Sequence, residues 1–507
     1  MLLRHERVFI VAVCIAAAVR VFTFSSAFPF FNNVDEQAHL DLVGKYSRFG
    51  VPGAGDDLLD PEFLKWMVLL GSPEYLRKAE KFPTGVFPTP GWARPDAVNK
   101  QIHKNLQRLK IVNHEQFNEP LYYIVAGAWQ RLGRALGLTH AGLLYWTRFL
   151  NIPLYVVIVL LGWQIGKTCF PQEPHQRLGL PLLISALPQD VFYSVSNDVL
   201  SPLFAGVAFY ALARLFATGR KEMCLAAAGG ATAAAILVKV TNIPLLGMLT
   251  IAIFFYYRDM EHGTVSRDFL RALALSSAVL IVPLAAWFGH SYATLGHLTG
   301  SAHKMKCLGI TYQPLWELFD HPIYGLAGFS HFLHHFMAAF WRGEFVWQLE
   351  RLAFLPLDYF YSVSSGVFLV ISVAYFWSSR RDSAQHAVFV VSSVTVGLTI
   401  LLWAGLSVIF DYGSCQSPSR QNPYFLSGRY MLCALYPFFI VYIDGAKILL
   451  RKVSPNLDPL AVLLVIALTI SGFEIWINWP AFSSLYNFFH MPLGAPESGA
   501  SITVSQP

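Results

Sequence analysis

The amino-acid sequence predicts an all-α protein whose helices cross a membrane many times. Of its 507 residues, 55% are hydrophobic and only 13% are charged, whereas soluble chains carry roughly 25% charged residues. The mean hydropathy is +0.46, and apolar runs long enough to cross roughly 30 Å of hydrocarbon recur along the chain. A soluble enzyme, a disordered chain and a nucleic-acid-binding protein are excluded, because the basic residues lie mainly at the ends of these runs.

The first apolar run begins at Val8, after the basic segment 1–7. It resembles a secretory signal, with a candidate cleavage site at Ser25-Ser26-Ala27. We expect an uncleaved helix, because Arg20 interrupts the run and the apolar pattern continues through Phe31. Further spans, about eleven in all, are expected at 147–166, 178–196, 199–218, 223–238, 240–257, 270–289, 359–379, 386–410, 428–448 and 458–477.

Residues 120–137 decide the predicted topology, because they form either a short span or a helix at the membrane interface. With an interfacial helix, most basic residues of the short loops fall on the side of the N-terminus, and the opposite connections hold only Lys239, Arg420 and Arg429. The positive-inside rule therefore favours the interfacial helix, a cytoplasmic N-terminus and a C-terminus outside. We expect a transmembrane domain over 1–480, long outer loops at about 32–146 and 290–358, and a short outer tail over 481–507.

Ionisable residues at the predicted outer helix ends are the candidate site. Asp35 and Glu36 follow the first span, Asp198 and Lys239 each lie between two apolar runs, and Arg429 begins the tenth span. Each alone is explained as well by snorkelling or by a structural ion pair. Carboxylates beside basic residues at a water–lipid boundary suit a substrate that carries phosphate.

The segment Asp35-Glu36-Gln37-Ala38-His39 places a carboxylate and an imidazole on one helical face. Either carboxylate would serve as a general base that activates an acceptor hydroxyl or amine. The alternative is that the acids complement a helix dipole. Further along, Glu119 precedes a proline and Tyr122, which is typical of an interfacial helix start and requires no function.

Histidines and cysteines in the outer loops suggest two further features. The second long loop holds seven of the 16 histidines, but their spacing is not specific for zinc, so surface or packing roles are the default. Cys307 and Cys415 both fall in predicted outer segments, where a disulfide between them is expected.

Several short motifs, in this order, resemble the GT-C superfamily of membrane glycosyltransferases. The motifs are the first helix with its internal arginine, the Asp-Glu pair, the Pro-Leu-Tyr-Tyr helix start, Ala186-Leu187-Pro188 and Ser194-Val195-Ser196-Asn197-Asp198. The Gly-Arg-Tyr element at 428–430 and the Asp-Glu-x-x-His element at 35–39 are similar to those of a group of predicted, largely uncharacterised bacterial members. Aminoarabinose transferases, protein O-mannosyltransferases and oligosaccharyltransferases are more distant relatives.

This resemblance implies sugar transfer on the outer face of a bacterial inner membrane, from a polyprenyl-phosphate donor to an envelope glycan, lipid or protein. It places Asp35, with Glu36 second, at the acceptor, and it implies that Lys239 and Arg429 hold the lipid phosphate. Asp198 would bind a divalent metal if one is used. We expect the remaining substrate contacts at His39, Glu119, Tyr122, Asn197, Arg420 and Tyr430.

Two departures from the family pattern matter. Aminoarabinose transferases have a phosphate-binding lysine where this chain has Glu119, so the anion must be held elsewhere. After Trp479 only a short tail follows, without the large soluble domain of oligosaccharyltransferases, so a peptide acceptor is not expected. The alternatives are a lipid-linked glycan flippase, an O-antigen polymerase, and an acyltransferase that uses His334 and His335.

Overall fold

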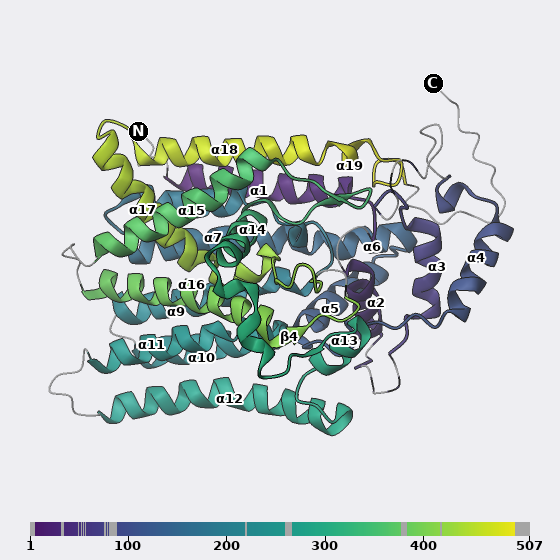
Figure 1. The fold of residues 1–507 in the computed structure, drawn as a ribbon, viewed down its shortest axis with the longest axis horizontal. Coiled ribbons are helices and arrows are strands. Elements are labelled where there is room, and N and C mark those ends of the chain that lie inside the picture. Colours follow the sequence, from purple (N-terminus) through teal and green to yellow (C-terminus); the bar gives the residue numbers. More distant parts are fainter. Residues whose placement is uncertain are drawn as a thin grey trace.

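The computed structural model describes residues 6–491 except 32–34, 49, 52, 54, 56, 76–77, 79, 81–88, 218–220, 259–265, 377–382 and 416–417. Long helices lie side by side in a bundle with roughly parallel axes (Figure 1). In chain order they are α1 (Glu6–Ala27), α7 (Asn151–Cys169), α8 (Pro174–Ala186), α9 (Leu200–Ala217), α10 (Lys221–Val238), α11 (Pro244–Arg258), α12 (Arg267–Leu295), α15 (Leu355–Phe376), α16 (Ser383–Ile409), α17 (Leu435–Val453) and α18 (Pro459–Ile477).

The predicted class, an all-α polytopic membrane protein, is confirmed. Within the described residues, nine helices are long and apolar enough to cross a membrane, and the helix at Glu222–Val238 is apolar but shorter. This count is lower than the predicted eleven, because two predicted spans lack a helix of full length. One is 223–238, the shorter apolar helix just named. The other is 178–196, where α8 has only 13 residues and ends at Ala186. It ends there because Pro188 disfavours a helical conformation at Leu187, which is extended with ψ of 112°.

Shorter helices gather at one end of the bundle (Figure 1). They include α2 (Glu36–Ser47), α3 (Pro61–Leu70), α4 (Asp96–Arg108), α5 (Leu121–Ala135), α6 (His140–Phe149) and α13 (Ser301–Leu308). The predicted interfacial helix corresponds to α5, whose 15 residues are fewer than a span requires. The two segments predicted as long outer loops thus contribute helices to the same end, which we call the cavity end.

The remaining elements are short or connect the bundle helices. They are α14 (Leu326–Arg342), α19 (Trp479–Ser483) and the 3-10 turns η4 (Gly91–Ala93), η5 (Asp190–Phe192), η6 (Asn197–Val199), η7 (Val240–Asn242), η9 (Glu317–Asp320), η10 (Pro322–Tyr324) and η11 (Gly428–Ala434). The strand β1 (Thr311–Tyr312) pairs antiparallel with β4 (Phe410–Asp411), with Thr311 opposite Asp411. In the same way β2 (Val346–Trp347) pairs with β3 (Glu350–Arg351). The β1–β4 pairing holds the segment after α13 against the end of α16 through backbone hydrogen bonds.

Two buried ion pairs fasten distant parts of the chain. Arg20, within α1, contacts Glu474 of α18 at 3.2 Å and also donates to the hydroxyl of Tyr155 and to the carbonyl of Leu187. Near the cavity end, Arg148 of α6 pairs with Glu36 of α2 at 2.6 Å. Charges at such depth are costly unless they are paired. These contacts therefore explain why an arginine stands inside the first helix, and they assign Arg20 a structural role.

The predicted disulfide is wrong, because Cys307 and Cys415 are both free. The Sγ atom of Cys307 lies 3.5 Å from the Nε2 atom of His303, one turn earlier on α13. The thiol therefore faces its own helix. Of the predicted terminal segments, residues 1–5 and 492–507 lie outside the described residues.

Candidate functional site

A cavity of about 330 Å³ at the cavity end collects charged side chains from segments far apart in the sequence. We call it the charged cavity. Its polar lining consists of Asp35, His39, Glu115, Asn118, Glu119, Asn197, Asp198, Thr241, Ser301, Lys239, Lys304, Arg429 and Tyr430. Most of the predicted site residues thus face one space, although they come from the start of α2, η6, η11 and the segments before α5 and η7.

Asp35 stands at the N-cap position of α2, but its carboxylate does not cap the helix. Its backbone is left-handed, with φ of 68°, a conformation that aspartate adopts more readily than most residues. Its Oδ1 atom lies 2.8 Å from Nε2 of His114, and its Oδ2 atom lies 3.8 Å from a guanidinium nitrogen of Arg429. The helix-dipole alternative is therefore insufficient, because the side chain is directed at partners in the cavity wall.

The electrostatic environment keeps Asp35 ionised. Burial alone would raise the pKa of this carboxyl, but the hydrogen bond from His114 and the charges of Lys304 and Arg429 hold it well below its usual range. The same pairing raises the pKa of His114 above its ordinary value, against the effect of burial. Asp35 is thus a fixed negative charge rather than a strong proton acceptor.

Glu115 and Lys304 form a second ion pair in the wall. Lys304 comes from α13, so this contact joins the second long connecting segment to the turn before α5. Burial would raise the pKa of Glu115, but the ammonium of Lys304 lowers it to about 2. Glu115 also lies 3.5 Å from the imidazole of His114, which places it beside the Asp35 pair.

Arg429 lies between two carboxylates without a close hydrogen bond to either. Its Nε atom is 3.6 Å from Asp198, which itself bonds the ammonium of Lys239 at 2.7 Å. Arg429 is only 9% exposed, and its Nε atom has no hydrogen-bond partner within the described part of the chain. The guanidinium and the ammonium lie 5.7 and 5.1 Å from the centre of the Tyr430 ring. The guanidinium therefore keeps hydrogen-bonding capacity for an incoming anion.

Two titratable groups of the cavity are shifted towards their neutral forms. Burial lowers the pKa of His39 to about 4, and its Nδ1 atom hydrogen-bonds the Tyr123 hydroxyl at 2.8 Å. Burial raises the pKa of Glu119 to about 7, against the backbone hydrogen bonds and the Lys239 charge that lower it. Glu119 thus exchanges protons near neutral pH, as a general base does.

Three of the predicted site residues do not line the cavity. Glu36 is fully buried, and both of its carboxylate oxygens accept hydrogen bonds from Arg148 and from backbone N–H groups. Tyr122 is buried and packs against Tyr123. Arg420 is exposed and pairs with Asp411 at 2.6 Å. The structure therefore places these three residues outside the charged cavity and gives no support there to the catalytic role of Glu36 or to substrate binding by Tyr122 and Arg420.

The predicted metal role of Asp198 does not fit the structure. Its two oxygens face Lys239 and Arg429, so a divalent cation would meet two positive charges. Among the described residues, one other group has metal-ligand spacing, since ligand atoms of Asp35, His114 and Glu115 lie within 4.8 Å of one another. The ammonium of Lys304 already pairs with Glu115 in this group, so the group does not suit a divalent cation.

The histidines of the second long segment lie outside the charged cavity. His331, His334 and His335 form a row on α14, and their rings lie 4.4 and 4.8 Å apart in successive contacts. His334 bonds the Ser362 hydroxyl at 2.7 Å, and His331 lies 3.3 Å from the Asn422 amide oxygen. This position does not support the alternative in which His334 and His335 carry the reaction in the charged cavity.

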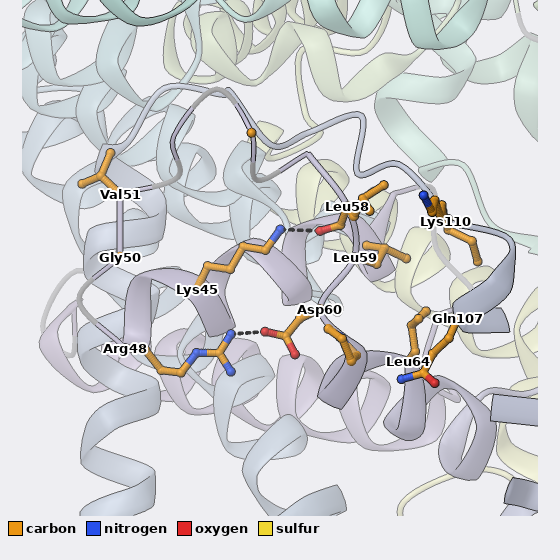
Figure 2. A pocket seen from close by; sticks show the side chains of 13 residues that line it. Lys45, Arg48, Gly50, Val51, Leu58, Leu59, Asp60, Leu64, Gln107 and Lys110 are labelled. Atoms are coloured by element: carbon orange, nitrogen blue, oxygen red, sulfur yellow. Dashed lines mark hydrogen bonds and ion pairs between the residues drawn. The ribbon is translucent and has the colours of Figure 1, made fainter. Parts of the chain in front are cut away.

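A larger cavity of about 510 Å³ lies nearby, between α2, α3 and the end of α4. Figure 2 shows Lys45 and Arg48 on one side and Gln107 and Lys110 on the other. Lys45 donates to the Leu58 carbonyl at 2.7 Å, and Arg48 pairs with Asp60 (Figure 2). Because these two cations are already paired, this cavity is a weaker candidate than the charged cavity.

Sequence reasoning missed His114, Glu115 and Lys304. They lie in the long segments between spans, where no helical periodicity marks which side chains face inward. One signal was present, since a His-Glu pair at 114–115 is separated by only two residues from Asn118-Glu119-Pro120. Nothing in the sequence indicates that Lys304, almost 190 residues further on, completes the wall.

The fold and the cavity define a class: a polytopic helical membrane protein with a charged cavity at one end of its bundle. Residues 89–433, more than half of the chain, match the model of a family described as predicted membrane protein (DUF2142), and the chain belongs to this family.

A comparison with curated proteins found no match. Among solved structures, the chain is similar to the Archaeoglobus fulgidus oligosaccharyltransferase complex with Zn and sulfate, with 12% identity and a TM-score of 0.37 over 92% of this chain and 53% of that chain. For the apo form of the same oligosaccharyltransferase, the identity is 11% and the TM-score is 0.38, over 92% of this chain and 56% of that chain. The chain thus spans about half the length of these structures. At this similarity, function must be argued from the charged cavity itself.

Proposed function

We propose that the chain is a membrane glycosyltransferase of the GT-C type, which moves a sugar from a polyprenyl-phosphate donor to an envelope acceptor. One observation carries the proposal: the lining of the charged cavity combines charged side chains with apolar ones. The apolar lining residues include Ile243, directly before α11, residues of α16 and its end, and Phe425. Ile243 is 45% exposed, so this part of the lining reaches the outer surface of the bundle. An amphipathic cavity of this kind suits a ligand with an isoprenoid chain and a phosphate.

The donor phosphate would bind among the charged lining residues, between Lys239, Lys304 and Arg429. These cations come from three different elements and converge on one space. Arg429 presents a planar fork, and its Nε atom lacks a hydrogen-bond partner among the described residues. Charge-assisted hydrogen bonds of this type stabilise the phosphate as negative charge develops on it during departure.

The acceptor would be held by Asp35 and deprotonated by Glu119. Asp35 is ionised and orients the acceptor hydroxyl or amine by accepting its hydrogen bond. Glu119, with a pKa of about 7, takes the proton as the acceptor oxygen or nitrogen bonds to the anomeric carbon. The bond from that carbon to the phosphate oxygen breaks, and its electron pair leaves with the phosphate. A single displacement of this kind inverts the anomeric configuration.

The sidedness of the reaction follows from the charge count in the sequence. Most basic residues of the short connections belong to the end of the bundle opposite the charged cavity. The positive-inside rule supports a cytoplasmic N-terminus and a cavity on the outer face of the inner membrane. A reporter fused after Thr139 is expected outside the cytoplasm, and a cytoplasmic signal would overturn this orientation.

The deciding experiment compares lipid-linked sugars and envelope glycans in cells with and without the gene. We expect one polyprenyl-phosphate sugar to accumulate on deletion, and the wild-type gene to restore its level. The Asp35→Asn variant should be produced normally and fail to restore it. Unchanged lipid-linked sugars would overturn the proposed transfer. If the protein were a flippase, deletion of its gene would instead prevent labelling of the lipid-linked sugar from outside the cell.

A further inference from the structure

A third cavity, of about 310 Å³, lies at the opposite end of the bundle from the charged cavity. Its charged lining includes Glu173 before α8 and Asp444, Lys447, Arg451 and Lys452 of α17. Helix α17 begins directly after η11, which carries Arg429, and has 19 residues. At 1.5 Å per residue it spans about 28 Å, close to the thickness of a bilayer's hydrocarbon core. This third cavity therefore lies at the other membrane surface, and we call it the distal cavity.

The inner wall of the distal cavity offers hydrogen-bond acceptors. Gln176 is 3% exposed, and its Nε2 atom donates to Oδ1 of Asp444 at 3.3 Å. This bond fixes the orientation of the amide, because only the NH₂ group can face a carboxylate. The Oε1 atom of Gln176 is buried without a hydrogen-bond partner among the described residues. A buried acceptor of this kind is costly until a donor reaches it.

The rim of the distal cavity is basic. Lys447 is largely buried and pairs with Glu173. Arg451 and Lys452 are exposed, and the ammonium of Lys452 lies 5.7 Å from the centre of the Tyr375 ring. Cations that line a cavity between helices at a membrane surface are typical of sites for phospholipid headgroups. The rim therefore suits a phosphate, while the inner wall suits a hydrogen-bond donor.

We propose that the distal cavity binds the headgroup of a phosphatidylethanolamine lipid. The phosphate would contact Arg451 and Lys452 at the rim, and the ammonium would reach the Oε1 atom of Gln176 inside, beside Asp444. The ammonium is favoured over a neutral hydroxyl because the carboxylate of Asp444 lies beside Gln176. This site is separate from the charged cavity and does not depend on the proposed glycosyl transfer.

The test is native mass spectrometry of the purified full chain, titrated with dioleoyl phosphatidylethanolamine, phosphatidylcholine or phosphatidylglycerol. We expect the ethanolamine lipid to bind about fivefold more tightly than the choline lipid, which has no N–H donor. Gln176→Leu should remove this preference and leave the choline lipid unaffected. Arg451→Gln combined with Lys452→Gln should weaken both lipids about tenfold, since each basic residue contributes to binding of the phosphate.

The matched control is Lys167→Gln combined with Arg258→Gln, which removes two exposed cations from the same end of the bundle but outside the distal cavity. It should leave all affinities unchanged. An equal loss in this control, or equal binding of the ethanolamine and choline lipids, would overturn the site. Tighter binding of phosphatidylglycerol would overturn the choice of ethanolamine. Competition by inorganic phosphate at equal affinity would show a soluble anion as the occupant.

Discussion

Asp35 and Glu36 are neighbours in the chain, yet they belong to two different electrostatic environments. Glu36 lies in a closed cluster, where Arg148 contacts both of its oxygens at 2.7 and 2.6 Å and backbone N–H groups of Phe31 and Val195 supply two more bonds. Asp35 opens onto the charged cavity, where its nearest guanidinium, that of Arg429, remains 3.8 Å away. The carboxylate of Glu36 already accepts its full set of hydrogen bonds, whereas the carboxylate of Asp35 can accept further ones.

The comparison shows that charge and burial do not by themselves identify a site. Arg148 and Glu36 are both fully buried, as many catalytic groups are, but Glu36 does not line the charged cavity and both of its oxygens already accept hydrogen bonds. Arg429 is almost as deeply buried, and its Nε atom has no hydrogen-bond partner among the described residues. Incomplete hydrogen bonding beside a cavity distinguishes Arg429, which we propose to be functional, from the structural Arg148–Glu36 pair.

The largest effect should come from Asp35→Asn, which keeps the shape and removes the charge. Transfer should fall by roughly 100-fold or more, because the acceptor loses its anionic hydrogen-bond partner. Purified enzyme with the accumulated lipid-linked sugar would give the rate, and Asp411→Asn, at the exposed Arg420 pair, is the matched control. A rate within twofold of wild type would remove Asp35 from the proposed mechanism.

On the structural side of the comparison, Arg148→Met should destabilise the fold. The carboxylate of Glu36 would remain buried without its cation, and such a loss costs about 3–5 kcal/mol. Thermal unfolding in detergent should show a lower midpoint, and adding Glu36→Gln to Arg148→Met should recover part of it. If Arg148→Met unfolds at the wild-type temperature, the closed cluster does not hold α2 to α6.

A smaller effect is expected from Arg429→Lys, which retains the charge but loses the planar fork. The KM for the lipid-phosphate donor should rise by about tenfold, because a single ammonium cannot replace two parallel N–H bonds to phosphate. Steady-state kinetics would separate KM from kcat. An unchanged KM would indicate that Lys239 and Lys304 bind the donor without Arg429.

The pH dependence of transfer should report Glu119. Its pKa of about 7 means that the carboxyl becomes protonated as the pH falls through neutrality. A protonated carboxyl cannot accept the acceptor's proton, so the rate should decline by about tenfold per pH unit below 7 and level off above it. Glu119→Gln should be slow and lack this decline. A decline that persists in Glu119→Gln would assign it to another group.

The smallest effect is expected from Arg420→Gln. The side chain is exposed, and its pair with Asp411 is screened by water. Neither the transfer rate nor the thermal midpoint should change measurably when both are compared with wild type. A clear loss of donor binding would restore Arg420 to the substrate-binding residues. It would also weaken the distinction between charges that line the charged cavity and charges on the exposed surface.

Much of the bundle was predictable, because apolar runs and their interruptions identify helices directly. The exception at 178–196 had a local signal in Pro188, which ends α8 early. Several cavity residues were also predictable, since Asp35, Asp198, Lys239 and Arg429 are charges at the ends of apolar runs. The sequence did not indicate that the hydrogen-bonding positions of Glu36 are all occupied, because its partner Arg148 lies 112 positions away. Lys304 was missed because it lies in a polar segment without periodicity.

The Arg20–Glu474 pair has a consequence for biosynthesis. These residues are separated by 454 positions, so at about 5–20 residues per second Arg20 is made roughly 20–90 s before its carboxylate partner. Its other acceptors arrive sooner, since the Tyr155 hydroxyl and the Leu187 carbonyl follow after 135 and 167 positions. We expect the nascent first helix to be captured by α7 and α8 in turn, and translation of α18 to complete the insertion.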